Sequence, residues 1–308
     1  MQQYKRFSKK FPQTKQNEPL AKHTTFKVGG PADLFLEAQT TDEIVTAVNL
    51  ARQLKIPYRI IGVGGNILAA DEGFRGLIIK NEADKFTISG NKIITDSGVL
   101  VGKLVLKAAK KGLDLTFLAG FPSTVGGATY GNAGKPGKSI GDVLESAKII
   151  NSTGQVGDTR KEYFDFSYRH SMIKETGEII LEITLVLETG KPDELVKKIR
   201  AQQVLRKVKN LPGGAAGSVF KNVKKELLEG DFRSEFKDFV PAGWLIERAG
   251  GEGQKTGGAY VWEGHCNVII NSGTATASDI KKLIEILKNK VKNKFGVTLE
   301  EEIQYLGF

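Results

Sequence analysis

The alternation of hydrophobic and polar positions predicts short strands separated by amphipathic helices. Residues 33–38 (DLFLEA) and 58–61 (YRII) have the apolar character of strands, and residues 41–54 carry apolar side chains at the i, i+3, i+4 spacing of a helix. Pro57 ends that helix, because proline disrupts a helix interior. The resulting β-α-β segment runs directly into residues 62–66 (GVGGN), a position at which phosphate groups commonly bind.

Later segments show the same two periodicities. A helix is predicted at residues 100–111, a basic helix begins at Pro192 and continues to about residue 209, and an amphipathic helix capped by Ser278 lies near the C-terminus. The apolar face of this last helix consists of Ile280, Leu283, Ile284, Leu287 and Val291. Further strands are predicted at residues 77–80, 86–89, 92–96, 147–151, 178–187 and 267–271.

Two glycine-containing stretches interrupt this pattern. Residues 118–142 contain seven glycines and no sustained period. They are therefore predicted to form one long loop, where a compact domain usually has loops of about four to six residues. A loop of that length indicates a function. Residues 211–217 (LPGGAAG) follow the basic helix and are the best candidate for a domain boundary.

Composition and charge narrow the class of protein. The chain has 308 residues, 40% of them hydrophobic and 26% charged, which fits two packed domains and excludes a disordered or low-complexity chain. With 45 Lys and Arg against 35 Asp and Glu, the net charge of +10 favours an anionic partner. Nucleic acid, an acidic membrane surface and a phosphate-bearing small ligand all satisfy that charge, and its sign does not choose among them.

Few residues of this chain could bind a metal, and no long apolar stretch could cross a membrane. The single cysteine, Cys266, excludes an intrachain disulfide and a thiolate metal cluster, and three histidines leave little for a His-rich site, so no metal is expected. The N-terminus lacks the apolar stretch of a signal peptide, and no window approaches the roughly 18 apolar residues of a spanning helix. We therefore expect a cytoplasmic protein without membrane insertion.

Glycine is the unusual component, since 36 glycines make up about 12% of the chain against a usual value near 7%. The GVGGN motif could turn successive N–H groups toward a diphosphate, or could be only a tight turn after a strand. It is not the G-x-G-x-x-G of a Rossmann site, because the third glycine is missing. The second cluster, residues 120–134, offers donors and small hydroxyls along an extended path. Together the two clusters favour an extended dinucleotide.

At these residues the sequence resembles the UDP-N-acetylenolpyruvoylglucosamine reductase (MurB) family, flavoenzymes of peptidoglycan precursor synthesis. The resemblance covers nearly the whole chain, and the short segment from Tyr168 to Glu188 is similar to the compact type II form. Each motif is short, but seven of them occur in the family's order. They are residues 17–33 (NEPLAKHTTFKVGGPAD), 62–66 (GVGGN), 119–134 (AGFPSTVGGA with GNAG), 168–171 (YRHS), 217–222 (GSVFKN), 242–247 (AGWLIE) and 295–303 (FGVTLEEEI).

The resemblance implies an α+β protein with an FAD-binding domain of the vanillyl-alcohol oxidase (PCMH) type and a C-terminal α+β substrate-binding domain. The first domain would cover residues 1–209, in two subdomains at about 1–83 and 84–209, and the second residues 210–308. The implied reaction is the NADPH-dependent reduction of UDP-N-acetylglucosamine enolpyruvate to UDP-N-acetylmuramate through a bound FAD. The implied partners are NADPH and the UDP-sugar, and a monomer is expected.

The chemistry of this reaction can be compared with the residues present. Reducing an enolpyruvyl ether requires a hydride, a cation beside the carboxylate and an acid for the neighbouring carbon. Arg169 matches the family's catalytic arginine, Ser218 its proton donor and Glu302 its C-terminal acidic residue. Without the other motifs, Arg169 would more often be a surface ion pair and Ser218 a turn serine. Glu300 remains the alternative to Glu302 by a slip of register.

The resemblance also implies which residues bind substrate and cofactor. Substrate contacts would come from Tyr168, Lys221, Asn222 and His265, although a lone histidine beside a strand is more often structural. The FAD contacts would come from Gly62, Val63, Gly64, Gly65, Asn66, Ile67, Gly120, Pro122, Ser123, Thr124, Gly126, Gly127, Ala128, Asn132 and Gly134.

Four positions depart from the family pattern. Gly65 stands where serine is usual, which removes a hydroxyl from the diphosphate loop but keeps the N–H. Ser123 replaces a glycine, a change that costs about 1 kcal/mol or more if φ is positive there. Val223 and Glu301 each replace a proline and so loosen a rigid position. Since the catalytic triplet is intact, an active enzyme is expected.

Two other functions remain in competition. Another FAD-dependent oxidase or dehydrogenase of the same flavin fold, acting on an alcohol or sugar, would share the glycine clusters but would have no reason to carry YRHS, GSVFKN and Glu302 together. A nucleic-acid-binding protein would explain the positive charge, but the Lys-rich helices have few interleaved aromatic residues and no known reader motif. No nucleic-acid partner is therefore expected.

Overall fold

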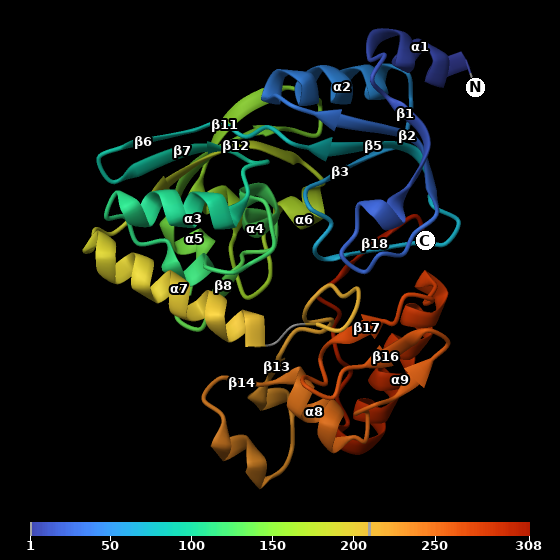
Figure 1. Ribbon diagram of the computed structural model, residues 1–308, viewed down its shortest axis with the longest axis vertical. Helices are drawn as coiled ribbons and strands as arrows, with labels where there is room; N and C mark the ends of the chain where they lie inside the picture. The colour runs from blue at the N-terminus through green and yellow to red at the C-terminus, as the bar shows by residue number, and fades with distance from the viewer. Residues whose placement is uncertain (1, 209–210) are drawn as a thin grey trace. The chain divides into compact units, whose positions relative to one another are not determined.

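The computed structural model describes residues 2–208 and 211–308 and divides into two compact units (Figure 1). The first unit comprises Met1–Asn17, Asp33–Val63 and Gly76–Lys209, and the second Glu18–Ala32, Gly64–Arg75 and Asn210–Phe308. The boundary predicted between residues 209 and 210, with the predicted end of the basic helix, lies outside the described residues.

The N-terminal part of the first unit is built on a four-stranded sheet in the order β1-β2-β5-β3. Its strands are β1 (Lys15–Pro19), β2 (Pro31–Ala38), β3 (Tyr58–Ile61) and β5 (Phe74–Asn81), and β3 runs parallel to β5. Two helices, α1 (Gln2–Lys10) and α2 (Thr41–Gln53), bury Phe7, Ile44 and Val48 with Leu34 and Leu36 of the sheet. The predicted β-α-β segment is confirmed. The helix α1 was not predicted, because its residues are almost all polar and show no apolar period.

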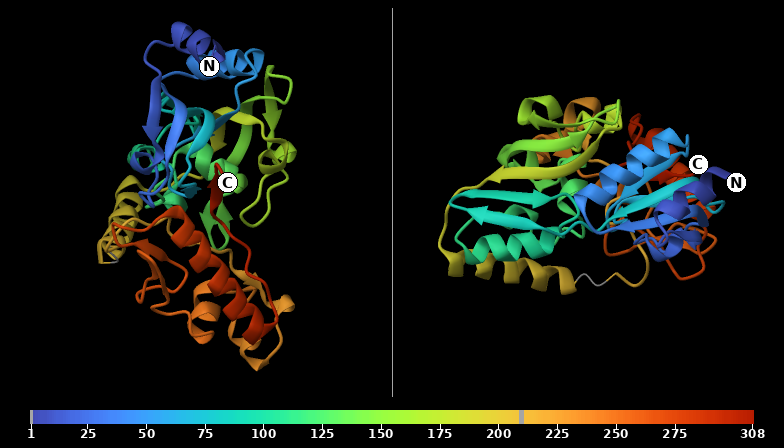
Figure 2. Two further views of the ribbon diagram at one scale, coloured as in Figure 1. Left: turned by 90° about the vertical axis from the view of Figure 1, so that its right-hand side faces the viewer. Right: turned by 90° about the horizontal axis from the view of Figure 1, so that it is seen from above.

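A five-stranded antiparallel sheet in the order β11-β10-β12-β7-β6 forms the rest of the first unit. The helices α3 (Val101–Lys110) and α7 (Pro192–Val208) lie on one side of it (Figures 1 and 2). Side chains of β7, β10 and β12 that face this side, among them Ile93, Ile149 and Ile183, form the core with α3. The strands are β6 (Phe86–Ser89), β7 (Lys92–Asp96), β10 (Leu144–Ile150), β11 (Val156–Arg160) and β12 (Ile179–Val186).

The glycine-rich segment 118–142 is not the single long loop that its sequence predicts. It contains the helix α4 (Val125–Tyr130), the hairpin β8 (Gly134–Lys135) with β9 (Lys138–Ser139), and the helix α5 (Ile140–Val143). Elements of two to six residues are too short to produce a hydrophobic period, which is why the prediction was wrong.

The described residues of the second unit form three small sheets and two main helices. A three-stranded sheet packs on the long helix α9 (Ala277–Phe295), and C-terminal strand β18 pairs in parallel with β4. The predicted apolar face of α9 is buried, but its N-cap is Thr276 and not Ser278. The other helix is α8 (Ala242–Arg248), and the strands are β4 (Ile67–Ala69), β13 (Val223–Lys224), β14 (Phe239–Val240), β15 (Lys255–Thr256), β16 (Ala259–Val261), β17 (Ile269–Asn271) and β18 (Gln304–Leu306).

The remaining helical segments are single turns that connect these elements. They are η1 (Leu20–Lys22), η2 (Thr116–Leu118), η3 (Lys161–Phe164), α6 (Ile173–Thr176), η4 (Lys225–Leu227) and η5 (Asp231–Glu235). Within residues 2–208 and 211–308, no helix has both the length and the apolar character required to cross a bilayer.

Candidate active site

The GVGGN loop follows β3, and its glycines are required for different reasons. A Cβ on Gly62 would lie 2.7 Å from the hydroxyl oxygen of Thr124, so the loop touches the second glycine cluster there. Gly64 has φ of +65°, and a Cβ on it would lie 2.0 Å from the carbonyl oxygen of His23. Only glycine fits at Gly64, because both the conformation and the space exclude a side chain.

Successive N–H groups in this loop form a potential anion site. For the N–H groups of Gly64, Gly65 and Asn66, no acceptor occurs among residues 2–208 and 211–308. The carbonyl of Gly64 is held instead by the N–H of Thr25 at 3.1 Å. Consecutive amide donors around a left-handed glycine are the arrangement that binds diphosphate, so this set fits the diphosphate of FAD. Val63 precedes the set, and Ile67 begins β4 after it.

The second glycine cluster is organised by the start of α4. Thr124 caps the helix by accepting the N–H of Gly127 at 3.1 Å, and Ala128 is buried. The N–H of Gly126 donates to the carbonyl of Ser97 at 2.7 Å, and a Cβ on Gly126 would lie 2.7 Å from Cβ of Ser97. The N–H of Gly126 therefore holds α4 in place and has an acceptor within the protein.

Four other predicted cofactor residues, Gly120, Pro122, Ser123 and Gly134, lie around this helix. Gly120 has φ of +83°, Pro122 precedes the cap, and Gly134 in β8 has no room for a Cβ beside the carbonyl of Lys138. Ser123 does not have a positive φ, so its replacement of a glycine carries no backbone strain.

A tight turn presents Arg169. Ser167 and His170 exchange main-chain hydrogen bonds of 3.1 and 3.3 Å, which makes Tyr168 and Arg169 the two residues of the turn. Arg169 has φ of +57°, and its carbonyl accepts a hydrogen bond of 2.8 Å from Nζ of Lys174. The guanidinium lies 5.4 Å from the centre of the Tyr168 ring, a cation–π contact between the predicted catalytic arginine and a predicted substrate-binding residue.

The turn is fastened to the second glycine cluster. Asn132 donates from Nδ2 to the carbonyl of Ser167 at 2.8 Å and accepts the N–H of Gly141 at 3.1 Å. Ser171 donates to the carbonyl of Tyr130 at 2.7 Å. The first unit thus brings the GNAG and YRHS motifs together, which are more than thirty residues apart in sequence.

In the second unit, Ser218 and Glu302 lie on neighbouring segments of one antiparallel ladder. The N–H of Glu302 donates to the carbonyl of Val219 at 2.7 Å, and the N–H of Lys221 to the carbonyl of Glu300 at 2.8 Å. Ser218 follows Gly217, which has φ of +75°, and is exposed. The GSVFKN motif and the C-terminal FGVTLEEEI motif are therefore joined by main-chain bonds.

The three successive glutamates have different surroundings. Glu300 is 76% exposed and pairs with Lys221 at 3.0 Å, whereas Glu301 is 17% exposed and pairs with Lys288 of α9 at 2.9 Å. The hydrogen bond to Glu301 raises the pKa of Lys288. Burial, followed by the charge and hydrogen bond of Glu301, raises the pKa of Tyr305. Glu301, which departs from the family pattern, is thus anchored by α9 and the C-terminal strand.

The other predicted substrate residues of the second unit lie near α8. The side-chain oxygen of Asn222 accepts the N–H of Ala242 at 3.2 Å, at the first residue of α8. His265 is exposed, and its Nδ1 accepts the N–H of Asn267 at 3.2 Å. Asn267 in turn bonds the main chain of Phe220 on both sides, at 2.9 and 2.8 Å. These bonds link the GSVFKN and GHCN segments.

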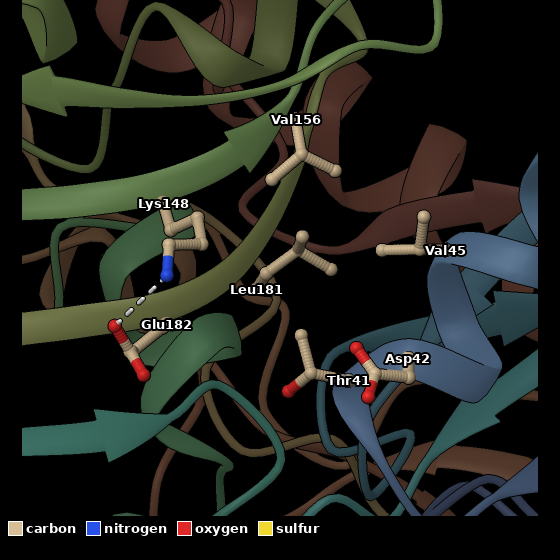
Figure 3. Close-up of a pocket in the computed structure, with 7 residues that line it drawn as sticks. All are labelled: Thr41, Asp42, Val45, Lys148, Val156, Leu181 and Glu182. Carbon is tan, nitrogen blue, oxygen red and sulfur yellow. Dashed lines mark ion pairs between the residues drawn. The ribbon is translucent and has the colours of Figure 1, made fainter.

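A surface depression of about 410 Å³ in the first unit is separate from these residues. Its walls include Lys148 and Glu182, whose charged groups are 3.8 Å apart (Figure 3). The lining residues are Thr41, Asp42, Val45, Lys148, Val156, Leu181 and Glu182. No predicted site residue is among them, so this depression is not the candidate active site.

The structure also identifies supporting residues that the sequence did not. Lys174, Asn267 and Lys288 each bond a site segment. Lys174 was detectable only as a cation five positions after Arg169, and Lys288 only as one of many lysines in α9. Neither spacing indicates a contact without the fold.

Known proteins of one family match this chain over its whole length. The model of the C-terminal domain of UDP-N-acetylenolpyruvoylglucosamine reductase matches residues 207–306, and an FAD-binding domain model matches residues 32–160. The chain is 39% identical over 316 residues to the UDP-N-acetylenolpyruvoylglucosamine reductase of Clostridium botulinum, covering 100% of this chain and 99% of the relative. It is 40% identical over 296 residues to that of Carboxydothermus hydrogenoformans, covering 95% and 93%.

A solved structure agrees with these sequence matches. The crystal structure of UDP-N-acetylenolpyruvylglucosamine reductase (MurB) from Thermus caldophilus superposes with a TM-score of 0.74 at 29% identity, over 94% of this chain and 98% of that chain. The predicted α+β architecture with a PCMH-type FAD-binding domain is therefore confirmed.

Proposed function

This chain belongs to the UDP-N-acetylenolpyruvoylglucosamine reductase family, and from that premise we propose which of its residues perform the family's reaction. The enzyme is an FAD-dependent oxidoreductase of peptidoglycan precursor synthesis. It uses NADPH to reduce the enolpyruvyl ether of UDP-N-acetylglucosamine to UDP-N-acetylmuramate. FAD, when bound, takes a hydride from NADPH and supplies it to the substrate double bond.

Cofactor binding is assigned to the two glycine clusters. We propose that the N–H groups of Gly64, Gly65 and Asn66 hold the diphosphate, because they are consecutive donors around a left-handed glycine. The segment from Gly120 to Gly134 would line the rest of the cofactor, with Thr124 and Gly126 setting the position of α4.

Arg169 is assigned to the substrate carboxylate. A guanidinium stays charged at all relevant pH values and can grip a carboxylate through two parallel hydrogen bonds. It also stabilises the negative charge that develops beside the carboxylate after hydride arrival. The tight turn and the Lys174 contact hold its main chain, which is the observation that supports this role most directly.

Protonation is assigned to the second unit. Ser218 is exposed at a glycine turn, and its hydroxyl can protonate a carbanion that is a far stronger base than water. Loss of the proton leaves an alkoxide on Ser218. Lys221, three residues away, can stabilise this alkoxide until solvent restores the proton, provided that Lys221 leaves its ion pair with Glu300 to do so. We also propose that the carboxyl group of Glu302 acts on the substrate's carboxylate and on the charge that develops beside it after hydride transfer.

Further assignments follow the family. Tyr168, Lys221, Asn222 and His265 would contact the UDP-sugar. The FAD domain would cover residues 1–209, with subdomains divided near residue 83, and the substrate domain residues 210–308. We also propose a cytoplasmic monomer without a nucleic-acid partner, in which the +10 charge attracts anionic cofactor and substrates.

The two half-reactions separate these roles. Arg169→Met, Ser218→Ala and Glu302→Gln should each keep reduction of FAD by NADPH near the wild-type rate. Reoxidation of reduced FAD by the enolpyruvyl substrate should fall by about 100-fold to 1000-fold in Arg169→Met and Glu302→Gln, the usual effect of removing a preorganised charge stabiliser. In Ser218→Ala it should fall by about 100-fold to 10,000-fold, the usual effect of removing a general acid. Anaerobic stopped-flow absorbance measures both steps.

Several outcomes would contradict the assignment. Normal turnover of Ser218→Ala would make Ser218 only a turn residue, whereas partial recovery in Ser218→Cys supports a donor. A normal Glu302→Gln variant with an inactive Glu300→Gln variant would move the acidic role to Glu300. Activity on an alcohol or sugar, without activity on the enolpyruvyl substrate, would favour the oxidase alternative.

A further inference from the structure

Asn66 ends the GVGGN loop, and its side chain is directed at the peptide of Glu302. Nδ2 of Asn66 donates to the carbonyl of Glu302 at 2.8 Å. The carbonyl of Asn66 accepts the N–H of Gln304, also at 2.8 Å. One residue of the loop therefore bonds the C-terminal segment on both sides of Ile303.

We propose that Asn66 is a positioning residue that couples the cofactor loop to Glu302. Its N–H belongs to the set assigned to the diphosphate, while its side chain fixes the peptide of the acidic residue. The inference rests on the proposed role of Glu302 and adds a physical link between cofactor binding and that role.

The main-chain hydrogen bonds of the ladder hold the N-terminal side of Glu302, and Asn66 holds its C-terminal side. The N–H of Glu302 is held by Val219 at 2.7 Å, so the ladder fixes the residue on its N-terminal side. On the C-terminal side, the carbonyl of Glu302 accepts Nδ2 of Asn66 at 2.8 Å and Nε2 of Gln304 at 3.3 Å. The Asn66 bond is the shorter of the two and comes from a different part of the chain.

The link has a functional consequence because catalysis depends on sub-ångström placement. A displacement of about 1 Å in an acid or base can slow a reaction by about 100-fold. An anion that binds the N–H groups of Gly64, Gly65 and Asn66 orders the loop and, through the Asn66 amide, the peptide of Glu302. By linkage, an ordered C-terminal segment in turn favours the binding of that anion.

Hydrogen exchange tests the link without using activity. In wild-type protein, adding FAD should slow amide exchange in a peptide covering residues 299–306. In Asn66→Ala the same peptide should exchange at least about tenfold faster without FAD, and should lose the protection that FAD adds. The main-chain N–H of Asn66 is unchanged by this substitution, so FAD should still bind.

Rapid kinetics then tests the catalytic effect. Asn66→Ala should reduce its FAD with NADPH at close to the wild-type rate and reoxidise with substrate about 10-fold to 100-fold more slowly. The double variant Asn66→Ala with Glu302→Gln should reoxidise no more slowly than Glu302→Gln alone, because both changes remove the same contribution.

Asn271 provides a matched control in the same unit. It is a buried amide whose Nδ2 donates to the carbonyl of Phe26 at 2.9 Å, again far away in sequence. Asn271→Ala should lower the melting temperature but leave the ratio of the two half-reaction rates unchanged.

Wild-type exchange and reoxidation in Asn66→Ala would overturn the proposal. Multiplicative losses in the double variant would also overturn it, since Asn66 would then act elsewhere. If Glu302→Gln itself reoxidises normally, the proposed role of Glu302 fails. The coupling between the cofactor loop and the peptide of Glu302 would then be tested by the hydrogen-exchange data alone.

Discussion

At the scale of single residues, the backbone of Arg169 has a left-handed conformation. A φ of +57° costs a non-glycine residue about 1 kcal/mol or more. Asn132, bonded to the same turn, also has a positive φ, of +43°. Strained conformations persist where the surroundings enforce them and cluster at functional sites. Lys55, outside the candidate site, has φ of +54°, so the left-handed backbone supports the proposed role of Arg169 only together with the contacts that Asn132 and Lys174 make to its turn.

The adjacent glycines of α4 allow a prediction at the same scale. Gly126→Ala should destabilise the protein by about 1–3 kcal/mol, because its Cβ would lie 2.7 and 2.9 Å from Cβ and the carbonyl oxygen of Ser97. Gly127→Ala should destabilise it less, because the nearest atom is the side-chain oxygen of Ser123 at 2.8 Å, which can rotate. Urea unfolding of the FAD-free proteins measures the difference. Equal losses would mean that the start of α4 can shift away from Ser97.

At the scale of elements, α9 depends on a carboxylate from another part of the chain. Asp71 accepts the N–H groups of Ala277 and Ser278 at 2.7 and 2.9 Å, and the hydroxyl of Ser278 at 2.6 Å. The hydroxyl of Ser278 thus serves this carboxylate, while Thr276 caps the helix. Burial raises the pKa of Asp71, but these hydrogen bonds outweigh it and hold the pKa below its ordinary value of 3.8.

The sign of this shift predicts a pH dependence. A lowered carboxyl pKa contributes stability that is present above 3.8 and is lost as pH falls through the lower, folded-state value. Asp71→Asn should therefore reduce the free energy of unfolding at pH 7 by about 1 kcal/mol, as for loss of a helix cap, and the difference should shrink below pH 4. Thermal melting across pH 3–7 measures it, with the neighbouring Glu72→Gln as control. A difference that grows on acidification would exclude this role.

Strands with a clear apolar pattern were predicted from the sequence, whereas a polar helix and very short strands were not. The strands β3, β6 and β7 have the predicted bounds, because each is a run of alternating or apolar residues ended by turn formers. The helix α1 was not predicted, because its nine residues are mostly polar and only Phe7 is buried. In the second unit, β13–β16 are two or three residues long, below the length at which alternation is visible. Short elements depend on tertiary contacts, which a local pattern does not contain.

At the scale of the whole molecule, the second unit is assembled from three separate stretches of sequence. The N-terminal stretches are held by side-chain amides of distant residues, such as Asn271 to the carbonyl of Phe26 and Asn66 to the carbonyl of Glu302. The motifs predicted the family and the candidate site residues, but not these bonds. Asparagine is common in turns, so its sequence gives no sign of a partner more than two hundred residues away.

The distribution of nucleophiles over the whole chain predicts how FAD is held. A covalent link to the flavin ring is most often made through a cysteine or histidine side chain, and no such residue occurs in either glycine cluster. Cys266 is buried in the core of the second unit, and burial raises its pKa, which disfavours the reactive thiolate. Precipitation by acid or heat should therefore release all the flavin into the supernatant, with FAD identified by chromatography. Yellow colour retained in a washed, denatured pellet would contradict noncovalent binding. A colourless protein that cannot be reconstituted with FAD would contradict the assignment of the clusters themselves.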